Sequence, residues 1–355
     1  MNLHNTYYQM YVEIGGVMLF IVAFFLFYYM LDIKNVSFLL LFGIMSLFGN
    51  MLEVFYAPVL SFIYFLYKLT DMSHPLKSFQ IIFLITCTNN VNISTCLESI
   101  SKNNHSLNCL ILLLLQNNVK LSLESYITPY TSIKVLHKTH TIPLSQARNI
   151  LLKSERIHAG SFYMFPDDDS VFDQHFFEFF TKIITGNTLI AVKGTQSKSV
   201  YFLKMPERKW ALISDFDKAI SVNMVIKGTT IQKVGNFDEK LGVGNYYGAG
   251  EDNDYFLRCN AIEQFVFSND LWNYHPLPCK NTLQPVSKIL IRYKSYGRGV
   301  VYMLLKHRMI TEAAKVVVKG YLGCIKNLMM LNWKMAYVYL IAGSVRFYTF
   351  LKNIK

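Results

Sequence analysis

The sequence predicts an α/β fold, with a mostly parallel sheet and helices on both faces, between an N-terminal transmembrane hairpin and C-terminal amphipathic helices. Three observations predict it. Short apolar runs alternate with helix-like segments through the middle of the 355-residue chain, two long apolar runs precede them, and a basic tail rich in apolar residues follows. We therefore expect three parts, at residues 1–77, 78–280 and 281–355.

The first part has the pattern of a membrane anchor followed by a linker. Residues 14–31 are uncharged and mostly apolar, and the only charge in residues 36–67 is Glu53. Each run is long enough to span a bilayer, and the short connection between them suits a helical hairpin. No Lys or Arg precedes residue 14, unlike the start of a cleaved signal peptide, so we expect a retained anchor. Lys68 and Lys77 favour the cytoplasmic side for the chain that follows.

The middle part alternates expected strands and helices. The strands are expected at residues 79–86, 107–115, 133–138, 161–165 and 188–192. The helices are expected at residues 93–102, 144–155, 171–184 and 251–261. On sheets built in this way, ligands bind at the carboxyl ends of the strands.

A run of three acids lies at one of those strand ends. Asp167, Asp168 and Asp169 directly follow the expected strand 161–165, and adjacent carboxylates repel one another unless a cation lies between them. The run therefore points to a divalent metal and a phosphate-bearing substrate. A solvated turn or a helix N-cap is the alternative interpretation.

A second acidic cluster contains Glu251 and Asp252. It follows a glycine-rich bend at residues 248–250 and begins an expected helix, which would place a carboxylate at the mouth of a cleft, where it could act as a base. Acids in the first turn also stabilise a helix through its dipole, without any catalysis. The two interpretations are compatible.

The net charge of +12 lies entirely in the tail. Residues 280–355 hold fourteen Lys or Arg and one acid, Glu312, whereas residues 1–279 hold 21 bases and 22 acids. Basic residues mixed with apolar and aromatic ones are typical of helices that lie on an anionic membrane surface. A nucleic-acid partner is not expected, because the acidic clusters and the apolar N-terminus do not fit one.

The six cysteines show neither CxxC pairs nor the spacing of zinc ligands. We expect reduced, mostly buried thiols in a domain that faces the cytosol. Together with the anchor, this predicts a membrane protein whose middle part lies on the cytoplasmic side.

Six motifs in order give the chain a family resemblance: FQIIFLITCTNN, LSQARN, FPDDD, VGNFDEKLGVGNYYGAGEDNDYFLR, NYHP and SYGRG. From about Phe79 to His307 the chain resembles an inverting glycosyltransferase of family 2, of the membrane-anchored bacterial type. The resemblance implies the Rossmann-like GT-A fold and a hexosyltransferase-like activity. A sugar would pass from a nucleoside-diphosphate donor, expected to be a UDP-sugar, to a lipid-linked or polysaccharide acceptor in surface glycan biosynthesis.

The resemblance also implies a metal site that holds Mn²⁺ or Mg²⁺. Asp167 and Asp169 match the outer positions of the family's DxD signature, with Asp169 as a direct ligand and Asp167 contacting the ribose or the metal. His275 falls where related enzymes supply a further contact to the metal or the diphosphate. A His before a proline can also simply end a strand.

The resemblance gives roles to several further residues. Asp252 is expected to be the general base, and Glu251 to orient the acceptor or cap the helix. Arg148, with Asn149 beside it, is expected near the donor, and pairing of Arg148 with a neighbouring acid is the alternative. Residues 296–299 are expected to form a flexible loop beside the acceptor or the diphosphate, or a basic turn near the membrane.

The donor site departs from the family pattern. The remaining donor-binding candidates are Thr88, Asn117 and Asp168, beside Arg148 and Asp167. The aspartate that reads the base in the family is absent, since the second strand runs into Gln116 and Asn117. An amide from one of these two residues could bond the base instead.

Three other functions compete with this one. A sugar nucleotidyltransferase would carry a glycine-rich, basic loop after its first strand, and CTNNVN has neither feature. A catalytically inactive membrane scaffold could keep the fold, although the acidic motifs are intact. A processive synthase is disfavoured because no uncharged run of spanning length follows His307 and no QxxRW motif is present.

Overall fold

The computed structural model of the chain describes residues 79–89, 91–277 and 285–354. The expected transmembrane runs at 14–31 and 36–67 and the linker up to residue 77 lie outside the described residues. Among the helices that the structure does describe, none combines the length and the apolar character needed to cross a bilayer.

The first half of the sheet is parallel, in the order β3-β2-β1-β4. Its strands are β1 (Ile81–Cys87), β2 (Cys109–Leu115), β3 (Thr131–His137) and β4 (Phe162–Met164). All four match strands expected from the sequence, because each is a short apolar or β-branched run bounded by turn residues.

The second half of the sheet is mixed, so the expectation of a mostly parallel sheet holds for the first half only. Its strands are β5 (Thr188–Gly194), β6 (Tyr201–Leu203), β7 (Met224–Lys227) and β8 (Val266–His275). β7 pairs antiparallel with both β4 and β5, and β8 pairs parallel with β5. Because β7 is antiparallel to both β4 and β5, β5 runs in the same direction as β4, and so does its parallel neighbour β8. β4 and β8 therefore end at the same edge of the sheet.

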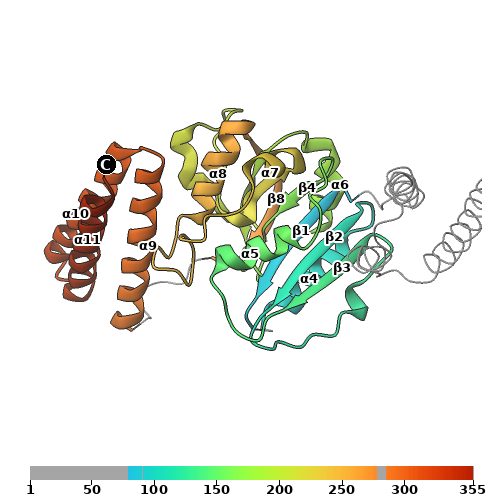
Figure 1. Cartoon of the computed structure of the whole chain (residues 1–355), viewed down its shortest axis with the longest axis horizontal. Helices are drawn as coiled ribbons and strands as arrows, with labels where there is room; N and C mark the ends of the chain where they lie inside the picture. The colour runs from blue at the N-terminus through green and yellow to red at the C-terminus, as the bar shows by residue number, and fades with distance from the viewer. Residues whose placement is uncertain (1–78, 90, 278–284, 355) are drawn as a thin grey trace, which may run out of the picture. The chain divides into compact units, whose positions relative to one another are not determined.

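Helices cover both faces of the sheet, as expected (Figure 1). The side chains of β1 alternate between two cores. Ile82 and Leu84 join the core under α5 (Leu144–Lys153) and α8 (Glu251–Ile262). Ile81, Phe83 and Ile85 join the core under α4 (Ile93–Asn103) and α6 (Gln174–Ile183). The shorter helices are α7 (Gly228–Val234), η1 (Glu124–Tyr126), η2 (Ile213–Lys218) and η3 (Ser221–Asn223).

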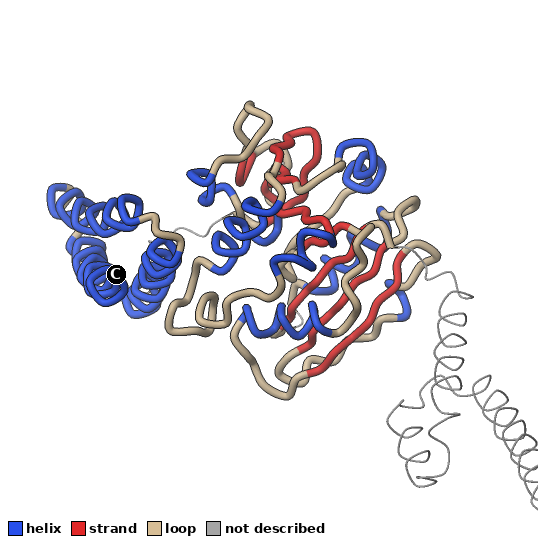
Figure 2. The backbone as a smooth tube through the Cα atoms, turned by 45° about the horizontal axis from the view of Figure 1, so that its top comes forward, coloured by secondary structure: helices blue, strands red, loops and turns tan. Residues whose placement is uncertain are grey.

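The basic tail folds into three long helices that lie side by side (Figures 1 and 2). They are α9 (Val286–Lys306), α10 (Ile310–Met329) and α11 (Trp333–Asn353). Glycines bring the helices close together, since a Cβ added to Gly320 in α10 would lie 2.9 Å from the Cα of Gly343 in α11. Residues 296–299, expected as a loop or turn, are inside α9, where Gly297 leaves room for the Arg346 side chain and Gly299 for the backbone of Ala249.

The cysteines of the described residues are free and buried, as expected. They are Cys87, Cys96, Cys109, Cys259 and Cys324. Cys279 lies outside the described residues.

Candidate active site

Three of the predicted site residues form a compact group at the carboxyl edge of the sheet. Asp167 and Asp169 follow β4, and His275 ends β8. The His275 Nε2 atom lies 3.6 Å from Asp167 Oδ2 and 3.3 Å from Asp169 Oδ1. One ligand atom from each residue can be chosen so that all lie within 4.8 Å of one another. The structure thus brings together the three residues that were expected to hold a metal.

A short antiparallel bridge fixes this meeting of distant segments. The amide of Val171 donates to the carbonyl of Tyr274 at 2.9 Å, and the amide of Tyr274 donates back at 2.8 Å. Val171 is two residues beyond Asp169, and Tyr274 immediately precedes His275. The acidic run is therefore held against the end of β8 by backbone hydrogen bonds.

The group has the chemistry of a divalent-cation site. His275 Nδ1 lies 2.9 Å from the carbonyl oxygen of Pro276, so Nδ1 carries a proton and Nε2 faces the two carboxylates. A ligand histidine commonly bonds a carbonyl through its other nitrogen in this way. Asp169 Oδ1 is buried and has no hydrogen-bond partner in the described part of the chain, which leaves it available to a cation. The two carboxylates suit Mn²⁺ or Mg²⁺, whereas an imidazole is a ligand of transition metals, so the donor set fits Mn²⁺ better than Mg²⁺.

The protonation of the group reflects crowded negative charge. Burial raises the pKa of Asp169, His275 opposes the rise, and repulsion from Asp167 adds to it. For His275, burial disfavours the charged ring, but the nearby carboxylates outweigh that effect and raise its pKa.

Arg148 connects the two acidic clusters. It lies in α5 with its side chain buried, and its Nη1 donates to Asp252 Oδ1 at 2.6 Å. Its Nη2 lies 3.8 Å from Asp167 Oδ1. Burial disfavours the charged guanidinium, but Asp252, Glu251 and Asp167 raise its pKa, so Arg148 is a permanent cation between the clusters. Arg148 therefore pairs with an acid, as the alternative interpretation expected, and it borders Asp167, Asp169 and His275, which we call the metal group.

Glu251 and Asp252 begin α8, directly after Gly250, whose φ of 90° suits glycine. Asp252 Oδ2 accepts a hydrogen bond from the amide of Ser221 at 3.0 Å, and 19% of the Asp252 side chain remains exposed. Glu251 is buried, and that burial together with the charge of Asp252 raises the pKa of Glu251 to about 7.

Two other side chains of the SQARN segment form hydrogen bonds with the glycine-rich loop that precedes the second acidic cluster. The Ser145 hydroxyl donates to the carbonyl of Leu241 at 2.7 Å. The Asn149 side chain donates to the carbonyl of Phe237 at 3.1 Å and accepts from its amide at 2.8 Å. Asn149 is buried, and its amide also bonds Glu239, so its hydrogen bonds position this loop.

The predicted donor residues gather around the ends of β1 and β2. The Asn117 side chain donates to the carbonyl of Thr88 at 3.2 Å and accepts from the Thr141 hydroxyl at 2.8 Å. Asp168 does not belong to the metal group, and its carboxylate lies beside the Cys87 thiol at the end of β1. Burial, followed by repulsion from Asp169 and Asp167, raises the pKa of Asp168 to about 6.

Two features of this region were not predicted. Asp254 of α8 is fully buried and forms ion pairs with Arg258 at 2.9 Å and Lys306 at 2.7 Å, and His307 Nε2 lies at hydrogen-bond distance, 2.8 Å, from Asp254 Oδ1. A Cβ added to Gly299 in α9 would lie 2.2 Å from the carbonyl oxygen of Ala249. The first helix of the tail thus packs against the loop that carries Glu251 and Asp252. The two glycines of the GRG sequence in α9 are the sequence feature from which this close contact could have been predicted.

Comparison with known proteins adds little to this geometry. No family model and no curated protein matches the sequence. The solved structures that are similar include S. aureus TarS (14% identity, TM-score 0.44), and the match covers 64% of this chain and 43% of that one. TarS 1–349 in complex with UDP-GlcNAc is 16% identical with a TM-score of 0.47, and the match covers 64% of this chain and 66% of that one. The mannosyltransferase PcManGT from Pyrobaculum calidifontis, in complex with GDP-Man and Mn²⁺, is 12% identical with a TM-score of 0.45, and the match covers 77% of this chain and 88% of that one.

These similarities carry no weight for the function of this chain, because every TM-score is below 0.5. The match also spans less than half the length of TarS. The geometry of the site must therefore support any proposal.

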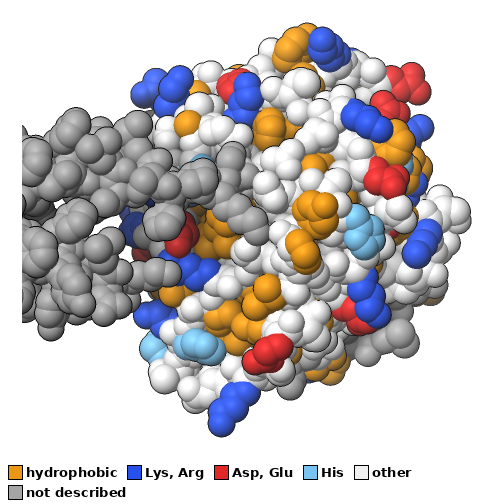
Figure 3. Space-filling model, turned by 90° about the vertical axis from the view of Figure 1, so that its right-hand side faces the viewer, with side chains coloured by type: hydrophobic (Ala, Val, Ile, Leu, Met, Phe, Trp, Pro, Cys, Tyr) orange, Lys and Arg blue, Asp and Glu red, His pale blue; other side chains and the backbone are white. Residues whose placement is uncertain are grey.

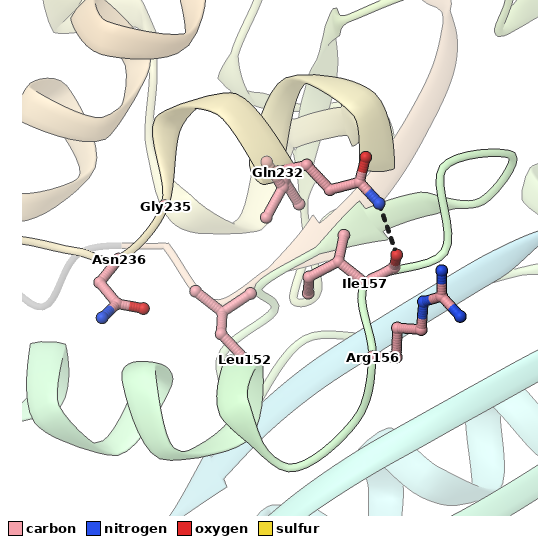
Figure 4. Close-up of a pocket in the computed structure, with 7 residues that line it drawn as sticks. Leu152, Arg156, Ile157, Gln232, Gly235 and Asn236 are labelled. Atoms are coloured by element: carbon pink, nitrogen blue, oxygen red, sulfur yellow. Dashed lines mark hydrogen bonds between the residues drawn. The ribbon is translucent and has the colours of Figure 1, made fainter. Parts of the chain in front are cut away.

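A cavity of about 350 Å³ lies elsewhere, between α5 and α7 (Figure 4). Leu152, Ile157 and Ile231 give it apolar walls, and the Gln232 side chain donates to the carbonyl of Ile157 at 2.8 Å beside it. None of the predicted site residues lines this cavity, so it is separate from the metal group.

Proposed function

We propose that this protein is a metal-dependent inverting glycosyltransferase. It would transfer a sugar from a nucleoside-diphosphate sugar, expected to be a UDP-sugar, to a lipid-linked or polysaccharide acceptor. The observation that carries the proposal is the connection of Asp167, Asp169 and His275 through buried Arg148 to Asp252. A cation held by the first three residues would lie near the carboxylate proposed to accept a proton.

In the proposed reaction, the acceptor oxygen forms a bond to the anomeric carbon while the bond from that carbon to the diphosphate oxygen breaks. The nucleoside diphosphate leaves with the electron pair, and the acceptor proton passes to Asp252. Asp167, Asp169 and His275 would hold Mn²⁺ or Mg²⁺, which offsets the charge that develops on the diphosphate. Thr88, Asn117 and Asp168 would contact the nucleoside side of the donor.

Asp252 is the proposed base because it is the more accessible of the paired acids, and Arg148 and the Ser221 amide fix its direction. Buried Glu251 would act on Asp252 through its charge. When Glu251 is ionised, a second negative charge lies next to Asp252. This role differs from orienting the acceptor, and a pH profile distinguishes the two.

The proposed location is the cytoplasmic face of the cell inner membrane, in surface glycan biosynthesis. The apolar runs at 14–31 and 36–67 and the basic tail support this part of the proposal. It is independent of the chemistry at the metal group.

The test is nucleotide release by the purified full chain. Nucleotide sugars, Mn²⁺ or Mg²⁺ and a polyprenyl-diphosphate-linked acceptor would be supplied, and the released nucleotide measured. We expect release to require metal, and to be lost in Asp169→Ala and Asp252→Asn but retained in Asp217→Asn, which changes an exposed acid. Full activity in both site variants would refute the proposal.

An inactive scaffold and a sugar nucleotidyltransferase give different results. A scaffold would release nothing and would show no metal-dependent donor binding by calorimetry. A nucleotidyltransferase would produce pyrophosphate from a nucleoside triphosphate and a sugar phosphate. The described structure offers no observation that favours either over the transferase.

A further inference from the structure

The turn between α10 and α11 concentrates large apolar side chains in solvent. Met329, Met330, Leu331 and Trp333 are 82%, 67%, 73% and 66% exposed. We call residues 329–333 the turn patch. Isolated apolar residues on a surface are ordinary, but a contiguous group of this kind marks an interaction site.

An apolar stripe on α10 leads into the turn patch. Val318, Leu322, Ile325 and Met329 are all exposed, and their spacing of four, three and four residues places them on one face of the helix. Cys324, Gly320 and Val317 lie on the buried side, against the other helices of the tail. The stripe therefore has no partner among the described residues.

Positive charge surrounds this apolar surface. Lys315, Lys319 and Lys326 are exposed beside the stripe, and exposed Lys334 follows the patch. In residues 285–354 the only acid is Glu312. The face of the protein in Figure 3 differs, since acidic and basic side chains alternate across it. An apolar stripe flanked by lysines matches the boundary between anionic headgroups and acyl chains.

We propose that the turn patch and the α10 stripe insert into an anionic bilayer surface. This inference rests on the membrane location in the proposed function, names the surface that makes the contact, and is independent of the reaction. Pairing of two copies through the same face is disfavoured, because it would bring Lys319 and Lys326 of one copy close to the same lysines of the other. A lipid surface supplies the opposite charge.

Trp333 is a natural probe of this contact. The full chain would be reconstituted into vesicles of phosphatidylglycerol and phosphatidylcholine that contain a doxyl-labelled lipid, and quenching of tryptophan fluorescence measured. We expect most of the lipid-dependent quenching to disappear in Trp333→Phe. It should persist in Trp210→Phe, because Trp210 is 47% exposed but lies outside the tail helices. Lys319→Glu combined with Lys326→Glu should reduce the quenching in vesicles that contain phosphatidylglycerol.

Two results would overturn the inference. One is equal lipid quenching in the native chain and in Trp333→Phe. The other is protection of Trp333 from iodide in detergent without lipid, rising with protein concentration, which would show that a second copy covers the patch. Nucleotide release, measured on the same samples, reports separately on the proposed reaction. Failure of the membrane contact and failure of the transferase assignment can therefore be distinguished.

Discussion

Arg148 Nη1 lies 2.6 Å from Asp252 Oδ1, and the same guanidinium lies 3.8 Å from Asp167. One buried cation therefore sets the spacing between the candidate base and the candidate metal group. Removing one partner of a buried ion pair leaves an uncompensated charge, which is more costly than losing a surface pair.

Arg148→Lys should lower kcat at least tenfold. Lysine keeps the charge but has one ammonium group in place of two terminal guanidinium nitrogens, so it cannot hold Asp252 and Asp167 in the same geometry. Arg148→Ala should in addition reduce the free energy of unfolding by about 3–5 kcal/mol. Steady-state kinetics and urea unfolding measure the two effects. Arg156→Lys, at an exposed position, is the control, and an equal loss there would contradict the specific role of Arg148.

Mn²⁺ should raise the melting temperature of the native protein, because a ligand of the folded state stabilises it. The increase should be absent in Asp169→Asn and in His275→Ala, and retained in His140→Ala, which changes an exposed histidine. Without metal, Asp169→Asn should be more stable than the native chain, since it relieves repulsion from Asp167 and Asp168. Thermal unfolding with and without Mn²⁺ tests both statements. An unchanged metal response in Asp169→Asn would exclude this site.

The rate of nucleotide release should rise with pH through an inflection near 7. Burial, together with the charge of Asp252, raises the pKa of Glu251 to about 7, so the negative charge of Glu251 beside Asp252 develops there. In Glu251→Gln this inflection should vanish while a reduced activity remains. The measurement is kcat against pH for both proteins. Persistence of the inflection in Glu251→Gln would assign it to another group.

Asp254 should contribute acid-sensitive stability. Burial raises its pKa, but His307, Arg258 and Lys306 outweigh burial and lower the pKa from 3.8 to about 2. Because the pKa is lower in the folded state, ionised Asp254 stabilises the protein at pH values above the unfolded-state pKa. This contribution is lost as the pH falls through the folded-state pKa. A shift of this size corresponds to about 2 kcal/mol, lost between roughly pH 4 and pH 2.

The matching variant is Asp254→Asn. It should destabilise the protein by about 2 kcal/mol at neutral pH and flatten the stability profile below pH 4. Urea unfolding at several pH values shows whether this is so. A variant with native stability would mean that the cluster of Asp254, Lys306 and His307 does not stabilise the packing of α9 against α8.

Gly299→Ala should reduce kcat and destabilise the protein by about 1–3 kcal/mol, because the new Cβ would overlap the Ala249 carbonyl and push the 248–250 loop away from α9. Gly160→Ala, where a Cβ meets nothing within 4 Å, should leave activity unchanged. Kinetics and thermal unfolding of the pair measure the effect. Equal activity in both variants would show that α9 does not position Glu251 and Asp252.

The sequence alone determined the strands and helices around the acidic run, because their local patterns are strong. β1, β2, β3 and α5 were expected within a few residues of their bounds. The acidic run was also apparent from the sequence, because three adjacent carboxylates follow an expected strand. β7 and β8 were not assigned, and the mixed half of the sheet follows from them.

Only the tertiary structure decided which distant residues meet. His275 lies more than a hundred residues beyond Asp169. It reaches the metal group because β7 lies between β4 and β5 in the sheet, antiparallel to both, and β8 pairs parallel with β5. Likewise, no local pattern indicates that Arg148 lies between Asp252 and Asp167, or that Gly299 touches Ala249. Local patterns reflect the conformational preferences of neighbouring residues, whereas these contacts depend on strand pairing and close packing between segments far apart in the chain.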